Sequence, residues 1–102
     1  FYGIVRQIPL YSWFMSLDIR SFDDYRAYLR VVCEHRKQTQ RHFSLAKWAR
    51  KLSLKSSSTL IMILKGTRNP SSELVEKLVQ DLQLGLDESK HFRNLVNLEK
   101  AK

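Results

Sequence analysis

Lysine and arginine side chains dominate one continuous stretch of this sequence. Between His35 and Ser72 there are nine of them and no aspartate or glutamate, although the whole chain has ten acidic residues. The nine are Arg36, Lys37, Arg41, Lys47, Arg50, Lys51, Lys55, Lys65 and Arg68. Such a stretch projects a positive field, which suits a polyanion. The net charge of +8 is compatible with nucleic acid, an anionic membrane surface or an acidic protein as the partner.

A run of small hydroxyl side chains lies inside this basic window, at Ser56, Ser57, Ser58 and Thr59. At the start of a helix, small hydroxyls let the backbone approach a duplex and can bond to base edges or phosphates. Free backbone amides at a helix start also attract anions. The run is equally compatible with a plain helix start, and a charged run with a solvated helix face.

No pattern typical of an enzyme is present. His35, His42 and His91 lack metal-ligand spacing, and Cys33 is the single cysteine. There is no Ser-His-Asp set, no paired carboxylates and no phosphate-binding glycine loop. We therefore expect no catalysis, no cofactor and no metal. The lone cysteine excludes an internal disulfide and fits a reducing cytoplasm, and no apolar run approaches the ~18 residues that span a membrane.

The composition and the apolar spacing predict that helices position these side chains. Gly and Pro are scarce, at three and two in 102 residues, and 43% of the residues are hydrophobic, enough for one compact domain. Helices are expected from about 23 to 38, 44 to 52, 56 to 64, 72 to 82 and 88 to 100. Their predicted N-caps are Asp23 or Ser21, then Ser44, a residue near Ser56, Ser71 or Ser72, and Asp87.

The apolar spacing predicts which faces are buried. Trp48, Ala49 and Leu52 face inward on the second helix, and Leu60, Ile63 and Leu64 on the third. Phe92, Leu95 and Val96, with Leu98 as a further candidate, face inward on the fifth. Cys33 falls beside the stripe of the first helix and reads as a small buried hydrophobe. Gly66 stands where a left-handed helix C-cap is wanted, and a turn of two to four residues separates the second and third helices.

Residues 1–20 differ from the rest, because they form an apolar, aromatic arm interrupted by Pro9. Packing against the chain's own core is one interpretation and dimerisation through the arm is the other. The last helix, 88–100, is a second candidate dimer contact. The domain organisation is therefore an arm, 1–20, and a helical domain, 21–102.

The segment LAKWARKLSLKSSSTLIMILKGTRNPS, at 45–71, resembles the lambda-repressor-like helix-turn-helix superfamily. More widely, the chain is similar to the N-terminal domain of a bacterial family of putative transcriptional regulators, in which a helical domain of unknown function follows. The matching segments are SFDDYRAYL at 21–29, FSLAKWARKLSLKSSS at 43–58, KGTRNPS at 65–71 and LGLDESKHFRNLV at 84–96. Ser53 stands at the turn position where the superfamily usually has Gly.

The resemblance implies a five-helix, all-α fold that binds double-stranded DNA, commonly as a dimer. Residues 55–59 would open the recognition helix and the 65–69 turn would lie near a phosphate backbone. Together with the basic residues that would flank the groove, the expected DNA-binding residues are Ser44, Lys47, Arg50, Lys51, Lys55, Ser56, Ser57, Ser58, Thr59, Met62, Lys65, Arg68 and Asn69. The alternative is a protein-interaction module that kept the fold but lost groove reading, since Ile61 and Met62 put apolar bulk on the recognition helix.

Overall fold

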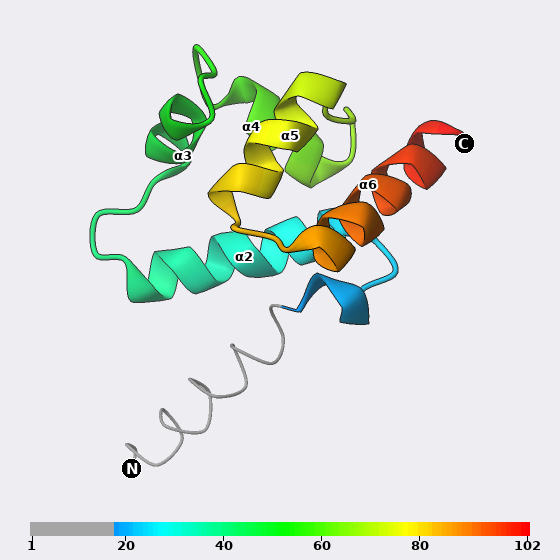
Figure 1. Cartoon of the computed structure of the whole chain (residues 1–102). Coiled ribbons are helices and arrows are strands. Elements are labelled where there is room, and N and C mark those ends of the chain that lie inside the picture. Colours follow the sequence, from blue (N-terminus) through cyan, green and yellow to red (C-terminus); the bar gives the residue numbers. More distant parts are fainter. Residues whose placement is uncertain (1–17) are drawn as a thin grey trace, which may run out of the picture.

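The computed structural model of the chain describes residues 18–102, and that part is all-helical (Figure 1). A 3₁₀ turn, η1 (Ile19–Ser21), precedes five α-helices: α2 (Tyr25–Thr39), α3 (Leu45–Lys51), α4 (Ser58–Lys65), α5 (Ser72–Asp81) and α6 (Leu86–Lys100). The predicted all-α class is confirmed, with no strand among the described residues. The predicted arm lies outside this range except for its last residues, of which Ile19 is fully buried in the core.

The long helix α2 forms the base on which the other helices pack (Figure 1). It contacts α4 and α6, while α3 packs on α4, α5 on α6 and η1 on α6. Its buried face carries Tyr25, Leu29, Val32 and Cys33, so the predicted burial of the cysteine is confirmed. The N-cap is Asp24, whose carboxylate accepts from the Arg26 amide at 2.9 Å, and the expected caps Ser21 and Asp23 are wrong.

Helix α3 begins as predicted, because the Ser44 hydroxyl accepts from the Lys47 amide at 3.1 Å. Trp48, Ala49 and Leu52 are buried, and Ala49 has no exposed surface where α3 meets α4. Helix α4 starts two residues later than expected: Ser56 lies before it, and Ser57 is an N-cap without a side-chain bond. The connection between the helices therefore runs from 52 to 57 and is longer than the predicted turn.

Three helices end in the same way, with a left-handed residue just past the last turn. The left-handed residues are Ser53 (φ 64), Gly66 (φ 97) and Gln83 (φ 55). After α3, the Ser53 amide donates to Arg50 O at 3.0 Å and the Leu54 amide to Ala49 O at 2.8 Å. This is the Schellman pattern, in which glycine is the usual left-handed residue. The predicted cap at Gly66 is confirmed, whereas Ser53 and Gln83 adopt the same backbone with a Cβ.

The last two helices close the core. Ser71 caps α5, accepting from the Leu74 amide at 3.1 Å, which settles the choice between Ser71 and Ser72. The predicted cap Asp87 is wrong: Gly85 is the N-cap, and its amide donates to the Glu88 carboxylate at 2.8 Å. Phe92, Leu95 and Val96 are buried as expected, but Leu98 is 64% exposed and does not join the core.

Replacing Ser53 with Gly should stabilise the domain. A residue with a side chain costs about 1–2 kcal/mol in the left-handed region. Glycine avoids this cost, but it loses more backbone entropy on folding, which cancels part of the gain. We expect Ser53→Gly to raise the unfolding free energy in urea by about 0.5–1 kcal/mol. The matched control is Ser57→Gly in the same connection, where φ is −77° and glycine should lower stability. Equal effects of the two substitutions would contradict the argument.

Candidate nucleic-acid interface

The predicted interface residues occupy one continuous part of the chain, from the N-cap of α3 to the loop after α4. Ser44, Lys47, Arg50 and Lys51 belong to α3, and Lys55, Ser56 and Ser57 to the connection. Ser58, Thr59, Met62 and Lys65 lie on α4, and Arg68 and Asn69 on the following loop. Because α3 and α4 pack on each other, these groups are carried by a single structural unit.

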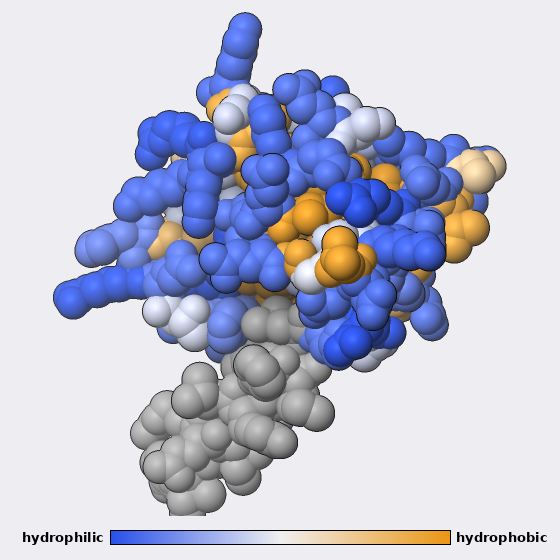
Figure 2. Space-filling view, in the orientation of Figure 1, coloured by the Kyte–Doolittle hydropathy of each residue, from blue (hydrophilic) through white to orange (hydrophobic). Residues whose placement is uncertain are grey.

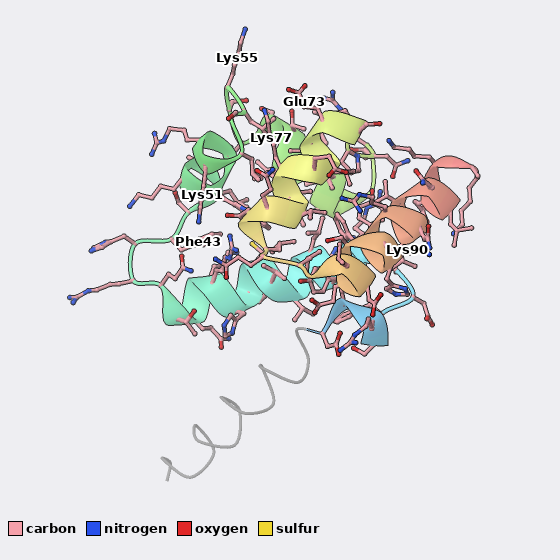
Figure 3. All side chains as sticks on the ribbon, viewed as in Figure 1. Phe43, Lys51, Lys55, Glu73, Lys77 and Lys90 are labelled. Carbon is pink, nitrogen blue, oxygen red and sulfur yellow. The ribbon has the colours of Figure 1, made fainter. Side chains whose placement is uncertain are left out.

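Five of the cationic side chains are exposed and form no ion pair with any carboxylate in residues 18–102. They are Lys47, Arg50, Lys55, Lys65 and Arg68. Lys55 leaves the connection and points away from the body of the molecule (Figure 3). Figure 2 shows hydrophilic side chains over most of the face around α3 and this connection. The surface can therefore attract an anion without first breaking an internal pair.

Some serine hydroxyl groups of this surface accept hydrogen bonds from the backbone, and others are exposed to solvent. Ser44 Oγ is occupied by its cap bond, and Ser56 Oγ accepts weakly from the Ser58 amide at 3.3 Å. Ser58 is exposed, whereas Ser57 and Thr59 are half-buried. Met62 and Ile61 are also half-buried, so α4 presents a mixed apolar and hydroxyl surface. Among these side chains, Ser58 is the most accessible to a ligand at the start of α4.

The position of the loop after α4 is fixed by Arg26, a residue that the sequence pattern did not single out. Its side chain crosses from α2 and only 8% of the residue is exposed. Nε donates to Ile63 O at 2.6 Å, and one terminal nitrogen donates to Tyr25 Oη, Asn69 Oδ1 and Arg68 O at 2.9, 3.1 and 3.3 Å. The other lies 3.7 Å from the Glu99 carboxylate of α6.

Arg30 repeats this contact one helical turn further along α2. Its Nε donates to Leu64 O at 2.8 Å, next to the carbonyl that Arg26 binds. The last carbonyls of a helix lack intrahelical partners and carry partial negative charge, so two guanidinium groups stabilise the end of α4. Asn69 Oδ1 also accepts from Tyr25 Oη at 2.6 Å. The side-chain oxygen of Asn69 was expected to contact the duplex, but it accepts hydrogen bonds from Tyr25 and Arg26 and so stabilises the fold.

A buried carboxylate, Asp81, joins α5 to α2 and α3. It accepts from Arg36 and from Trp48 Nε1, both at 2.9 Å, and lies 3.0 Å from Lys51 Nζ. The side chain of Asp81 is 4% exposed and that of Lys51 67% exposed. Burial alone would raise the pKa of Asp81, but Lys51, Arg36 and Trp48 together hold it below its ordinary value. The charge of Lys51 is therefore balanced by Asp81, whereas the five exposed cations named above have no such partner in residues 18–102.

Both buried charges had a signal in the sequence. Arg26 lies four residues after Phe22 and three before Leu29, on the apolar stripe of α2. Asp81 lies three residues after Leu78 and seven after Leu74, again on an apolar face. A charged residue at a core position is expected to be paired, because an isolated buried charge is too costly. The periodicity could therefore have identified the residues, although not their partners.

The comparisons with known proteins give no match: no family model fits the sequence, and neither a curated protein nor a solved structure matches it. In residues 18–102, no helix is long and apolar enough to cross a membrane. Within the same residues, no group of three or more His, Cys, Asp or Glu side chains lies close enough to hold a metal ion.

Replacing Arg26 with Met should destabilise the domain strongly. The change removes one donor from Ile63 O and one from Asn69 Oδ1 and leaves Glu99 without its cation, for which we expect a loss of about 2–4 kcal/mol. The measurement is the free energy of unfolding in urea, followed by helicity. Arg30→Met is the matched control, since Arg30 is exposed, and it should cost less than about 1 kcal/mol. Similar losses in the two variants would contradict the role given to Arg26.

Replacing Asp81 with Asn should remove a pH-dependent part of the stability. A carboxylate whose pKa is lowered by folding stabilises the native state above its unfolded pKa of about 3.9, and this stabilisation is lost as the pH falls through the folded value. We expect Asp81→Asn to cost about 2–3 kcal/mol at pH 7, and the difference from the parent chain to shrink below about pH 4. Urea unfolding at several pH values measures both.

Glu76 provides the control for that experiment. Its pKa is also lowered, by the Arg93 guanidinium at 2.7 and 2.8 Å, but both side chains are exposed to solvent. Exposed pairs contribute little to stability, so Glu76→Gln should change it only slightly at any pH. An Asp81→Asn chain as stable as its parent at neutral pH would disprove the buried-pair argument.

Proposed function

We propose that this chain is the DNA-binding domain of a bacterial transcriptional regulator that acts in the cytoplasm. In this proposal α3 and α4 form a lambda-repressor-like helix-turn-helix. Helix α4 enters the major groove of duplex DNA, and lysine and arginine residues on either side bind phosphates. The observation that carries the proposal is a set of five cations on one unit that pair with no carboxylate in residues 18–102: Lys47, Arg50, Lys55, Lys65 and Arg68.

The charge distribution favours a polyanion over a single acidic group. The five cations are spread along the chain over α3, the connection, the end of α4 and the following loop, so that they come before α4 and at or after its end. A duplex presents phosphates on both sides of its major groove, so this spread matches a groove-bound helix. Contacts of this type position a protein on DNA without reading its sequence.

Base reading falls to the exposed side of α4. Ser58 is accessible, and Thr59 and Met62 are partly so. A serine hydroxyl can bond to several bases, while methyl and thioether groups can contact the methyl group of thymine. Side chains that can form two hydrogen bonds to one base are scarce on this surface, so we expect a modest sequence preference. Most of the affinity would then come from phosphate contacts.

A protein-interaction module is the second candidate function. The observation that favours it is the half-buried pair Ile61 and Met62, which adds apolar area to a helix otherwise suited to DNA. Exposed apolar residues also occur on α6, where Leu86 is 92% and Leu98 64% exposed, as a homodimer contact would require. The two functions differ in their dependence on salt, because only duplex binding releases many counterions.

The test is the affinity for random-sequence duplex, measured by fluorescence anisotropy between about 50 and 200 mM salt. Neutralising roughly five phosphates predicts that log K falls with log salt at a slope of about −4 to −5. Arg50→Glu combined with Lys55→Glu should weaken binding by at least about 100-fold at the lower salt concentration, with helicity unchanged.

A matched control separates the interface from the overall charge. Lys90→Glu with Lys100→Glu makes the same change in net charge on α6, where both residues are exposed. This pair should weaken duplex binding by no more than about 5-fold, through the long-range field alone. No binding of micromolar protein at the lower salt concentration, or equal losses in the two double variants, would leave the protein-interaction module as the better candidate.

A further inference from the structure

A groove lies between the end of α2 and the face of α3, and its aromatic lining has no role in the proposed DNA contacts. It encloses about 280 Å³ and is lined by Arg36, Gln40, His42, Phe43, Lys47, Trp48 and Lys51. Phe43 and Lys51 lie on the same side of the molecule, at the far end from Lys90 of α6 (Figure 3). A volume at the lower end of the usual range for ligand pockets suits a small molecule of one or two rings.

Positive charge dominates the groove. Three lining side chains are cationic, Arg36, Lys47 and Lys51, and the carboxylate that contacts the lining is Asp81. Asp81 is bound to Arg36 and Lys51, so one negative charge faces three positive ones. Lys47 is exposed and pairs with no carboxylate in the described part of the chain. The site therefore retains a capacity for an anion.

The groove also has an apolar wall. Phe43 is half-buried and packs against Trp48 with ring centroids 6.0 Å apart at a tilt of 54°. The indole is held from two directions, by its Nε1 bond to Asp81 and by the Arg36 guanidinium 5.2 Å from the ring centroid. Trp48 is 2% exposed, so Phe43 is the ring that a ligand can reach. An apolar ring beside cations is what an aromatic acid requires, because its ring and its charged group need different partners.

The walls are set in place before any ligand binds. The Phe43 amide donates to Gln40 O at 3.1 Å, which fixes the turn between the helices, and Ser44 caps α3. The Arg36–Asp81–Lys51 cluster holds the two helices at the other side of the groove. A preformed site loses less conformational freedom on binding, so even a small ligand can be held.

We propose that this groove binds a small aromatic carboxylate, with the ring against Phe43 and the carboxylate on Lys47 beside Lys51. Residues 1–17 could not supply the anion, because they contain Arg6 and no acidic residue. A phosphodiester backbone would use the cations but leave the apolar wall empty. The inference stands apart from duplex binding, although a ligand on Lys47 and Lys51 would share these two cations with DNA.

The experiment is a ¹H–¹⁵N NMR titration of the full chain with 2-naphthoate at constant ionic strength. We expect saturable shifts confined to the Trp48 indole and the amides around Gln40, Phe43 and Lys47. Inorganic phosphate at the same ionic strength should bind at least about 10-fold more weakly, since it cannot use the apolar wall. Shifts that do not saturate by about 5 mM, that spread over the whole basic surface, or that phosphate reproduces at equal concentration would overturn the proposal.

Variants test the two parts of the site separately. Lys47→Gln should weaken 2-naphthoate at least about 5-fold through loss of the charge, and Lys90→Gln should leave it unchanged. Phe43→Ala should also weaken it at least about 5-fold, and Phe43→Leu replaces this variant if alanine unfolds the chain. Duplex affinity, measured on the Phe43 variant, should stay within about 2-fold. If the parent chain binds duplex but not 2-naphthoate, the aromatic-carboxylate proposal alone fails; if it binds 2-naphthoate but not duplex, the DNA proposal alone fails.

Discussion

The guanidinium group of Arg26 is the contact on which the arrangement of the other elements depends. It links four segments: α2, which carries it, the end of α4 through Ile63 O, the following loop through Asn69 Oδ1, and α6 through Glu99. A buried cation that binds several acceptors fixes geometry more strictly than apolar packing does, because a shift would break several directional bonds at once. The end of α4, and with it Lys65 and Arg68, is held relative to α2 by this one side chain.

Asp81 performs the corresponding task for α3. It binds the indole of Trp48 and pairs with Arg36 and Lys51, so the helix that carries Lys47 and Arg50 is tied to α2 and α5 through one carboxylate. A polyanion that competed for Lys51 would weaken one of these ties, yet the Arg36 and Trp48 bonds would remain. The fold thus keeps α3 in place while leaving the ammonium group of Lys51, which is 67% exposed, open to exchange.

Capping residues and apolar spacing predicted most of the helices, but they could not predict which residues far apart in the sequence bind each other. The caps at Ser44, Ser71 and Gly66 and the buried faces of α3 and α6 follow from spacing within one turn, and these predictions are confirmed. Asp87 failed as a cap because Glu88 bonds back to Gly85, and Ser56 failed as a helical residue because Ser57 is the N-cap of α4. The contact of Asn69 with Tyr25 joins residues 44 positions apart, which periodicity cannot foresee.

The cations of the acid-free window, residues 36–71, therefore fall into two groups, those that pair with a carboxylate and those that form no ion pair in residues 18–102, and the structure is needed to tell them apart. Arg36 and Lys51 belong to the window by sequence, but Asp81, from outside it, neutralises them in space. Lys47, Arg50, Lys55, Lys65 and Arg68 form no ion pair among the described residues, so their positive charges add up on one small domain. Like charges held together in this way oppose folding, and the cost is tolerable because the Arg26 and Asp81 clusters anchor the helices beneath them. An anion bound over this surface would relieve the repulsion, so the same charge that strains the free chain would stabilise its complex.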